Sequence, residues 1–347
     1  MFGGLTKFGG VTISLTPEVN AQQMKISAFY CYALTSCVAA AMLAGCGGSQ
    51  PPIGAPGAMR QTSSIATHAD RGKSWMLPEA KSEDLLYVSN VSNVVIFSYP
   101  AGKVVGELKG FSSNARLCVD SKGDVFATNF DPPALFEYAH GGSKRIATIK
   151  LPFHNGVSDC AFDPTTGNMA ISDFSNDVRV FAPGKTKPKS ITDPSMFFSQ
   201  SCVYDSKGDL FVSGLADASG NPLLTELPKG SRKFVNIQVS AVFNGESDMH
   251  WDGTYIDLGT PNSKALLQFS ISGSSGAVAG KVLLKGASEV VGFFIDDGTL
   301  ILSNWRTHRF LVSNTVRFYK YPGGGAPTFK LSKDLTRPRG VVVSPAQ

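Results

Sequence analysis

The sequence has 347 residues, of which 42% are hydrophobic, so it can build a large core and is not a wholly disordered chain. Its length allows about two average domains or one large all-β domain. Only 17% of the residues are charged, and the net charge of +5 is spread along the chain without a run of four or more Lys or Arg. This pattern argues against nucleic-acid binding and against a polybasic membrane surface.

The N-terminal part is predicted to be an export signal. Residues 1–23 carry no targeting pattern, and we expect translation to start at Met24, with the upstream segment a start-site misassignment. After Met24, Lys25 precedes an uncharged, mostly apolar run that reaches Met42, which is the arrangement of a secretory signal. A signal anchor that is not cleaved is the alternative interpretation.

The apolar run ends in Leu43-Ala44-Gly45-Cys46, which resembles the lipobox of bacterial lipoproteins. The resemblance implies a signal peptide over 24–45, lipidation of Cys46 and export to the bacterial cell envelope. Gly47 is not Asp, which by the same resemblance favours the outer membrane if the host has one. Residues 46–80 are rich in Gly, Ser, Pro and Thr without an apolar period, and we expect a flexible tether there.

Residues 81–347 contain a repeated pattern of an apolar strand, a turn with Asp and Gly, and a second strand. The two clearest copies begin at Cys118 and Cys202, and weaker copies contain Phe162, Trp251 and Ile295. Gly supplies the positive φ of the turn, and the Asp side chain can cap it, so each copy is predicted to be a hairpin. No window shows a sustained helical period, so we expect very little helix.

A second recurrent element, a strand followed by a Pro/Gly turn and another strand, lies between the hairpins. Together they give units of four strands and about 43 residues, which is typical of a propeller blade. The first unit lacks its innermost strand, and one surplus strand, Arg339–Pro345, follows the last unit. We therefore expect an all-β, six-bladed β-propeller with four-stranded blades, in which the C-terminal strand completes the first blade and closes the ring.

This layout resembles the NHL-repeat and gluconolactonase-like six-bladed propellers, over about Leu85 to Pro345 and on repeat architecture alone. The gluconolactonase-like enzymes hold a divalent metal at the channel through Glu, Asn and Asp. The Glu that they carry at the start of their first strand has no counterpart near Leu85. The resemblance thus implies the fold more than the activity.

Four polar residues begin successive inner strands and are predicted to gather at one mouth of the central channel: Arg116, Asp159, Ser201 and Asp248. They could bind a polar or charged ligand. Alternatively, Arg116 balances the acids at an ordinary wet channel mouth. A third interpretation is a site for Ca²⁺ or another divalent cation formed by Asp159, Glu246 and Asp248, since such cations take oxygen ligands. No other cofactor is predicted.

The body of the protein contains Cys118, Cys160 and Cys202. We expect them to be small apolar core residues. The alternative is a disulfide between Cys160 and Cys202, which requires a Cα separation below ~7 Å, whereas inner strands of neighbouring blades normally lie farther apart.

The sixth unit departs from the repeat by an insertion, Asn304–Asn314, between its second and third strands. It carries Trp305, Arg306 and His308, an aromatic and cationic set that could bind anions, sugars or peptide carboxylates. The alternative is that the insertion merely extends the sheet.

Two functions follow from these patterns. The first, which we favour, is a lipid-anchored binding or scaffold module of the cell envelope that is not an enzyme and contacts the membrane only through its N-terminal lipid. We expect a monomer that binds a protein, a peptide or a small polar ligand. The second is a divalent-metal-dependent hydrolase or lactonase of the gluconolactonase-like type.

Overall fold

The computed structural model describes residues 72–113, 116–151, 156–243, 248–260, 264–288, 290, 292–308 and 311–347. Residues 1–71, which include the expected signal peptide and Cys46, lie outside these ranges. The regular structure of the described chain is β-strand, and its one helical element is a short 3-10 helix, η1 (Pro78–Lys81). Among these residues, no helix has the length and hydropathy needed to span a membrane.

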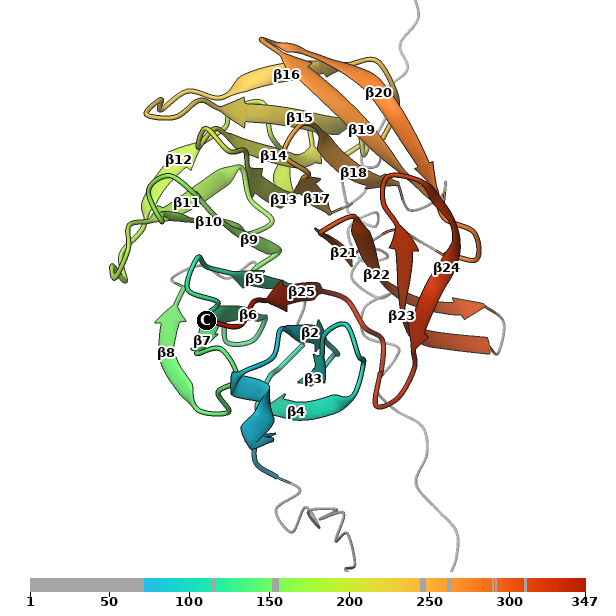
Figure 1. Cartoon of the computed structure of the whole chain (residues 1–347). Coiled ribbons are helices and arrows are strands. Elements are labelled where there is room, and N and C mark those ends of the chain that lie inside the picture. The colour runs from blue at the N-terminus through green and yellow to red at the C-terminus, as the bar shows by residue number, and fades with distance from the viewer. Residues whose placement is uncertain are drawn as a thin grey trace, which may run out of the picture. The chain divides into compact units, whose positions relative to one another are not determined.

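The strands form antiparallel meanders around a common centre, which is the arrangement of a β-propeller (Figure 1). Three sheets in the described ranges contain four consecutive strands each. From the inner to the outer strand they are β5 (Leu117–Val119), β6 (Val125–Asn129), β7 (Ala134–Tyr138) and β8 (Arg145–Lys150); β9 (Asp159–Phe162), β10 (Met169–Ser172), β11 (Asp177–Phe181) and β12 (Lys189–Thr192); and β21 (Gly292–Asp296), β22 (Thr299–His308), β23 (Leu311–Lys320) and β24 (Gly324–Leu331).

Two further meanders are joined into one eight-stranded sheet, so the expected separation into single blades does not hold here. Their strands are β13 (Phe198–Tyr204), β14 (Leu210–Leu215), β15 (Pro222–Leu227) and β16 (Val235–Val239), followed by β17 (Met249–Trp251), β18 (Ile256–Thr260), β19 (Ala265–Ser272) and β20 (Ser275–Leu283).

The junction is a short parallel pairing between the two outer strands, β16 and β20, with Val239 opposite Gly276. A Cβ atom at Gly276 would lie 3.1 Å from the Val239 side chain. The absence of a side chain at Gly276 therefore makes room for this close approach of the two outer strands. A single parallel bridge, Leu284 to Gly325, also brings the chain after β20 to β24.

The C-terminal strand completes the first sheet, as the surplus strand predicted. β25 (Val341–Ser344) pairs antiparallel with β2 (Leu85–Ser89), and the sheet continues through β3 (Asn93–Ser98) and β4 (Val104–Lys109). Outside β25 itself, the Ser89 hydroxyl accepts from the Gly340 amide at 2.8 Å. The first and last parts of the propeller are thus held by backbone pairing.

The folded region begins earlier than the predicted boundary at residue 81. β1 (Trp75–Met76) pairs with β4 as a fifth strand, and η1 follows it, so residues 75–80 are not part of a flexible tether. The reason is local: Gly106 has no side chain, and a Cβ there would collide with the Met76 sulfur, so this glycine makes room for the extra strand. The Trp75 indole also donates to Glu107 at 3.3 Å.

The Asp residues of the repeat cap their turns, which confirms the interpretation of the hairpin motif. The Asp120 carboxylate accepts from the backbone amides of Lys122 and Asp124, both at 2.9 Å. Asp205 makes the equivalent pair of contacts in its own hairpin. The motif is therefore a structural signal, since its acid is occupied by backbone donors.

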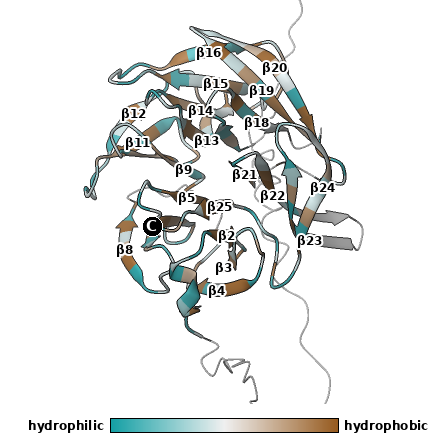
Figure 2. Cartoon of the chain, in the orientation of Figure 1, coloured by the Kyte–Doolittle hydropathy of each residue, from teal (hydrophilic) through white to brown (hydrophobic). Residues whose placement is uncertain are grey.

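The core lies between neighbouring sheets, where the side chains of one blade face pack against the next. Phe126 and Leu135 of the second sheet, for example, share a buried cluster with Ile171 and Phe181 of the third. Figure 2 shows hydrophobic colour mainly on the strands and hydrophilic colour on many of the turns. Because each blade buries both faces, loss of one strand exposes apolar surface on two sides.

We predict that deletion of residues 339–347 causes aggregation or a large loss of stability, because it removes β25 and leaves the buried strand β2 as a free edge. Thermal unfolding of the truncated protein, compared with a control that lacks only Ala346 and Gln347, measures the effect. A long truncation that melts like the full chain would contradict closure by β25.

Candidate functional site

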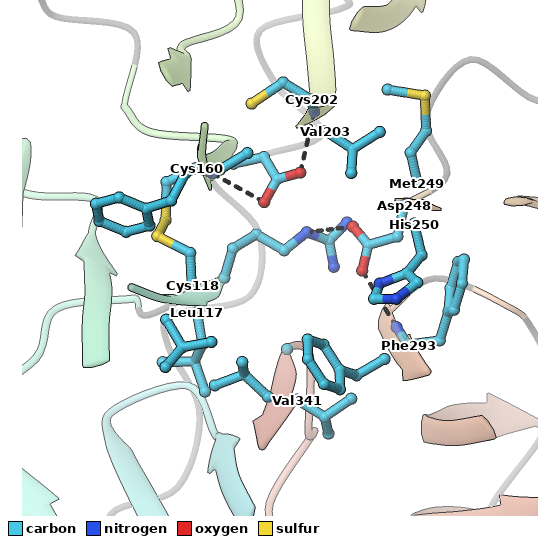
Figure 3. Close-up of a pocket in the computed structure, with 18 of the residues that line it drawn as sticks. Leu117, Cys118, Cys160, Cys202, Val203, Asp248, Met249, His250, Phe293 and Val341 are labelled. Atoms are coloured by element: carbon cyan, nitrogen blue, oxygen red, sulfur yellow. Dashed lines mark hydrogen bonds and ion pairs between the residues drawn. A yellow bond between two sulfur atoms is a disulfide. The ribbon is translucent and has the colours of Figure 1, made fainter. Parts of the chain in front are cut away.

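The polar residues predicted at the channel mouth come together in the structure. Arg116 lies just before β5, Asp159 begins β9, Ser201 lies within β13, and Asp248 immediately precedes β17. Arg116, Asp159 and Asp248 line a channel cavity of about 160 Å³ together with residues of the inner strands. Figure 3 shows this cavity, with Asp248 labelled.

An ion pair spans this end of the channel. Nε of Arg116 lies 2.9 Å from Oδ1 of Asp248, and Nη1 of Arg116 donates to the backbone carbonyl of Arg339 at 3.3 Å. The Arg116 N–H does not point at Oδ1, so the contact is an ion pair without an aligned hydrogen bond. Arg116 and Asp248 are only 6% and 7% exposed, so the mouth is a buried polar cluster rather than the wet opening that one interpretation expected.

Three residues at equivalent repeat positions make the same contact with the next inner strand. In each case a side-chain oxygen accepts a backbone N–H from the following blade. The pairs are Asp159 with Cys202 at 3.1 Å, Ser201 with Met249 at 3.1 Å and Asp248 with Phe293 at 3.2 Å. Asp159 also accepts from the Ser201 hydroxyl at 2.6 Å.

A disulfide joins Cys118 on β5 to Cys160 on β9, with a Cα–Cα distance of 5.8 Å, and Cys202 is a free buried thiol (Figure 3). The expectation that the three cysteines are unpaired core residues was therefore wrong for two of them. It failed because these inner strands lie closer than a typical propeller spacing suggests, and within the usual Cα range of disulfides.

The last inner-strand contact uses the backbone of the closing segment. The Ser303 hydroxyl lies 2.8 Å from the carbonyl oxygens of both Gly292 and Arg339. A Cβ at Gly292 would lie 1.6 Å from the Arg339 carbonyl oxygen, so only glycine permits this approach.

These contacts, which we call the channel belt, link the inner strands in succession from β5 through β9, β13, β17 and β21 to the segment before β25, and from there back to Arg116. The belt accounts for every sequence-predicted polar residue of the mouth that the structure describes. The acidic residues of the belt therefore help to hold the ring of inner strands together.

Burial dominates the electrostatics of the belt. It raises the pKa of Asp248 to about 7 although Arg116 lies beside it, and it also raises the pKa of Asp159. Two buried carboxyls face one guanidinium, so the cluster cannot hold both acids ionised without an uncompensated negative charge.

The expected divalent-cation site is only partly described. Glu246 lies outside the described residues, and Arg116 occupies the position beside Asp248 that a cation would need. Within the described ranges, no group of three or more His, Cys, Asp or Glu side chains has the geometry of a metal site.

The insertion of the sixth unit is a strand extension. β22 passes Ser303, which pairs with Gly292 at the start of β21, and continues to His308, which pairs with Leu311. We call residues 305–308 and 311–312 the arm; these parts of β22 and β23 extend beyond the end of β21 at which the belt lies. The side chains of Trp305, Arg306 and His308 lie outside the described part of the structure.

Sequence reasoning missed an acidic cluster between neighbouring blades. The Tyr321 hydroxyl lies 2.5 Å from Asp252 and 2.9 Å from Asp257, and burial raises the pKa of Asp257 to about 8. These residues are far apart in sequence, and only the repeat turn motif marked Asp252. Nearby, on the inner strand β17, burial lowers the pKa of His250 to about 4, so this histidine is neutral at pH 7.

Comparison with known proteins supports the fold alone. No protein-family model matches the chain, and no curated protein matches its sequence. A chain in the crystal structure of a nidogen/laminin complex is similar with a TM-score of 0.62 and 12% identity, covering 76% of this chain and 99% of that one. A protein of unknown function from Bacteroides caccae gives a TM-score of 0.58 at 11% identity, with the same coverage.

The β-propeller domain of Cps50 (Swd1) from Myceliophteria thermophila gives a TM-score of 0.50 at 12% identity and covers 76% of this chain and 86% of that one. The chain therefore has a β-propeller fold, and identities this low say nothing further about its activity.

We predict that Arg116→Met lowers the free energy of unfolding by about 3–5 kcal/mol, because it leaves buried carboxyls without their cation. The folded-state pKa of Asp248 is raised, so the stability contributed by its protonation is fully present below about pH 4 and is lost as the pH rises towards 7. The loss in free energy of unfolding caused by Arg116→Met should therefore be smaller at pH 5 than at pH 8.

Urea unfolding at the two pH values tests this, with Lys103→Met as the control because Lys103 pairs with Glu79 on the surface. The control should change stability by less than about 1 kcal/mol. A deficit of Arg116→Met that is small, or equal at both pH values, would show that the ion pair does not hold the belt.

Proposed function

We propose that this chain is a lipid-anchored, six-bladed β-propeller of the bacterial cell envelope that acts as a binding or scaffold module. The blade count treats the eight-stranded sheet as two blades, since its halves are complete four-stranded meanders whose strand pairing in the described residues is limited to the ends of β16 and β20. The other sheets then supply one blade each, and β25 completes the first of them.

Export is supported by two independent features. One is the apolar segment that ends in the lipobox-like Leu43-Ala44-Gly45-Cys46. The other is the disulfide between Cys118 and Cys160, because disulfides persist in oxidising compartments such as the periplasm and are rare in the cytosol.

The observation that carries the binding proposal is the arm. The repeat is regular around the ring, yet β22 and β23 continue beyond it for several residues at the channel end that carries the belt. The arm sequence includes Trp305, Arg306 and His308, residue types that are enriched where proteins bind partners. The belt polar groups below it are buried and already paired, so the proposal assigns ligand contact to the arm and the rim rather than to the belt.

A protein or peptide partner is the occupant that this arrangement favours. A projecting hairpin offers extended surface rather than a closed pocket, and the channel cavity of about 160 Å³ is small for an organic substrate. The likeness to a propeller found in a nidogen/laminin complex agrees with a protein-binding role. The lactonase alternative gains no such support, because Arg116 lies where its metal would be needed.

Anchoring is tested by metabolic labelling with palmitate. The wild-type protein should incorporate label and Cys46→Ser should not, whereas Cys31→Ser, a change within the apolar run, should be labelled normally. Labelling that persists in Cys46→Ser would remove the lipoprotein assignment.

Binding is tested by a photo-crosslinking residue at Trp305 in whole cells. We expect an adduct with a discrete envelope protein, and none when the same residue replaces Phe329, an aromatic side chain on the outer strand β24 that is 43% exposed. Equal crosslinking from both positions, or none from Trp305, would contradict a partner site on the arm.

A further inference from the structure

A groove that is separate from the channel lies between the first and second sheets. Its volume is about 630 Å³, within the range of roughly 300–1000 Å³ typical of small-molecule sites. It is bounded by the chain that follows β4, by the turn between β6 and β7, and by β8 at the outer edge of the second sheet (Figure 1). None of these segments belongs to the channel belt or the arm.

The apolar part of the groove is formed by two aromatic rings. Phe111 and Phe136 lie with their ring centres 5.5 Å apart, and they are 8% and 6% exposed. Ala134 and Pro133 continue the same apolar surface. Phe111, Pro133 and Ala134 provide the apolar surface against which a flat or branched group can pack, and Phe136 supports it from below.

The β8 wall carries Arg145, Thr148 and Lys150. Thr148 lies opposite Phe136 and Lys150 opposite Ala134, so their side chains share the groove side of the sheet. Regular alternation would turn Arg145 to the other side. A register shift opposite Glu137 and Tyr138 inserts one extra residue and brings Arg145 back to the groove.

Arg145 is held in place without losing its donors. Its guanidinium carbon lies 3.3 Å from the centre of the Phe136 ring, so the cation stacks on the ring face. Stacking leaves the in-plane N–H groups directed outward. In the part of the chain that the structure describes, neither Arg145 nor Lys150 takes part in an ion pair.

The opposite rim is less favourable for an anion. Asp131 lies there, and Asn129 is already used, since its Oδ1 accepts from Ser112 N at 2.7 Å and its Nδ2 donates to the Pro132 carbonyl at 2.8 Å. A negative group in the groove is therefore favoured near Arg145 and Lys150 and disfavoured near Asp131.

We propose that this groove binds a small organic carboxylate, whose carboxylate pairs with Arg145 and Lys150 and whose apolar body packs on the surface formed by Phe111, Pro133 and Ala134. Planar guanidinium groups recognise carboxylates through paired N–H donors, and the stacked position of Arg145 presents such a pair. The same chemistry occurs in a free aryl or branched acid and in the C-terminal residue of a peptide.

Calorimetric titration of the full chain with phenylacetate and with its neutral analogue phenylacetamide tests the proposal. Phenylacetate should bind at least about tenfold more tightly, as expected for a charge-assisted contact. Arg145→Gln and Lys150→Gln should each weaken the binding of phenylacetate, and Asp131→Asn should strengthen it. Thr148→Trp should abolish binding by filling the groove while both cations stay in place.

Lys281→Gln, on the outer strand β20, is the matched control for charge and should leave phenylacetate binding unchanged. Thermal melting of each variant identifies any loss of fold, and Arg145→Lys, which keeps the charge, should bind between wild type and Arg145→Gln. Absence of phenylacetate binding at millimolar concentration would overturn the proposal. So would equal binding of phenylacetamide, or a loss in Lys281→Gln that matches Lys150→Gln.

A second pair of probes distinguishes the two sources of the carboxylate. If N-acetylphenylalanine binds more tightly than phenylacetate and its amide does not bind, the groove recognises a peptide C-terminus. If phenylacetate binds more tightly, the natural ligand is a free acid. Either result is independent of the arm, so failure of the crosslinking experiment would not affect it.

Discussion

Inner strands of neighbouring blades are joined, one after another, by the channel belt, and the rest of the molecule depends on this chain of contacts. Strands of adjacent blades do not form a continuous hydrogen-bonded ladder around the channel, so the ring is held by packing between blades and by side chains that reach across. Asp159, Ser201 and Asp248 each accept an amide from the next strand. These bonds lie in a buried region, where an unpaired amide would be costly.

The pattern is interrupted at β5, next to the disulfide. At the equivalent position of β5 stands Arg116, which is only a donor and cannot accept an amide from β9. Its side chain turns across the channel to Asp248 instead. The link between β5 and β9 is then made covalently by Cys118 and Cys160, immediately beside the cluster. Disulfides are typical of proteins in oxidising compartments, which agrees with the proposed export.

Because the belt occupies the polar groups of the channel, surface features that depart from the repeat carry the proposals for function. The arm extends one hairpin beyond the ring, and in the groove the register shift between β7 and β8 turns Arg145 inward. Similar shifts occur in the β3–β4, β19–β20 and β23–β24 pairings, so the bulge belongs to the repeat and the arginine is the local feature. Propellers suit such changes, since each loop or outer strand can vary without disturbing the inner strands.

The sequence by itself determined the features that depend on local chemistry. Alternating strands, the Asp-capped turns at Asp120 and Asp205, the near absence of helix in the described chain and the pairing of the surplus C-terminal strand with β2 follow from short-range patterns and from strand counting. Only the tertiary structure decided which cysteines pair, that Arg116 faces Asp248, that β16 joins β20, and that Arg145 faces the groove. Each of these depends on distances between blades or on a bulge, and repeat spacing in a single chain carries no information about either.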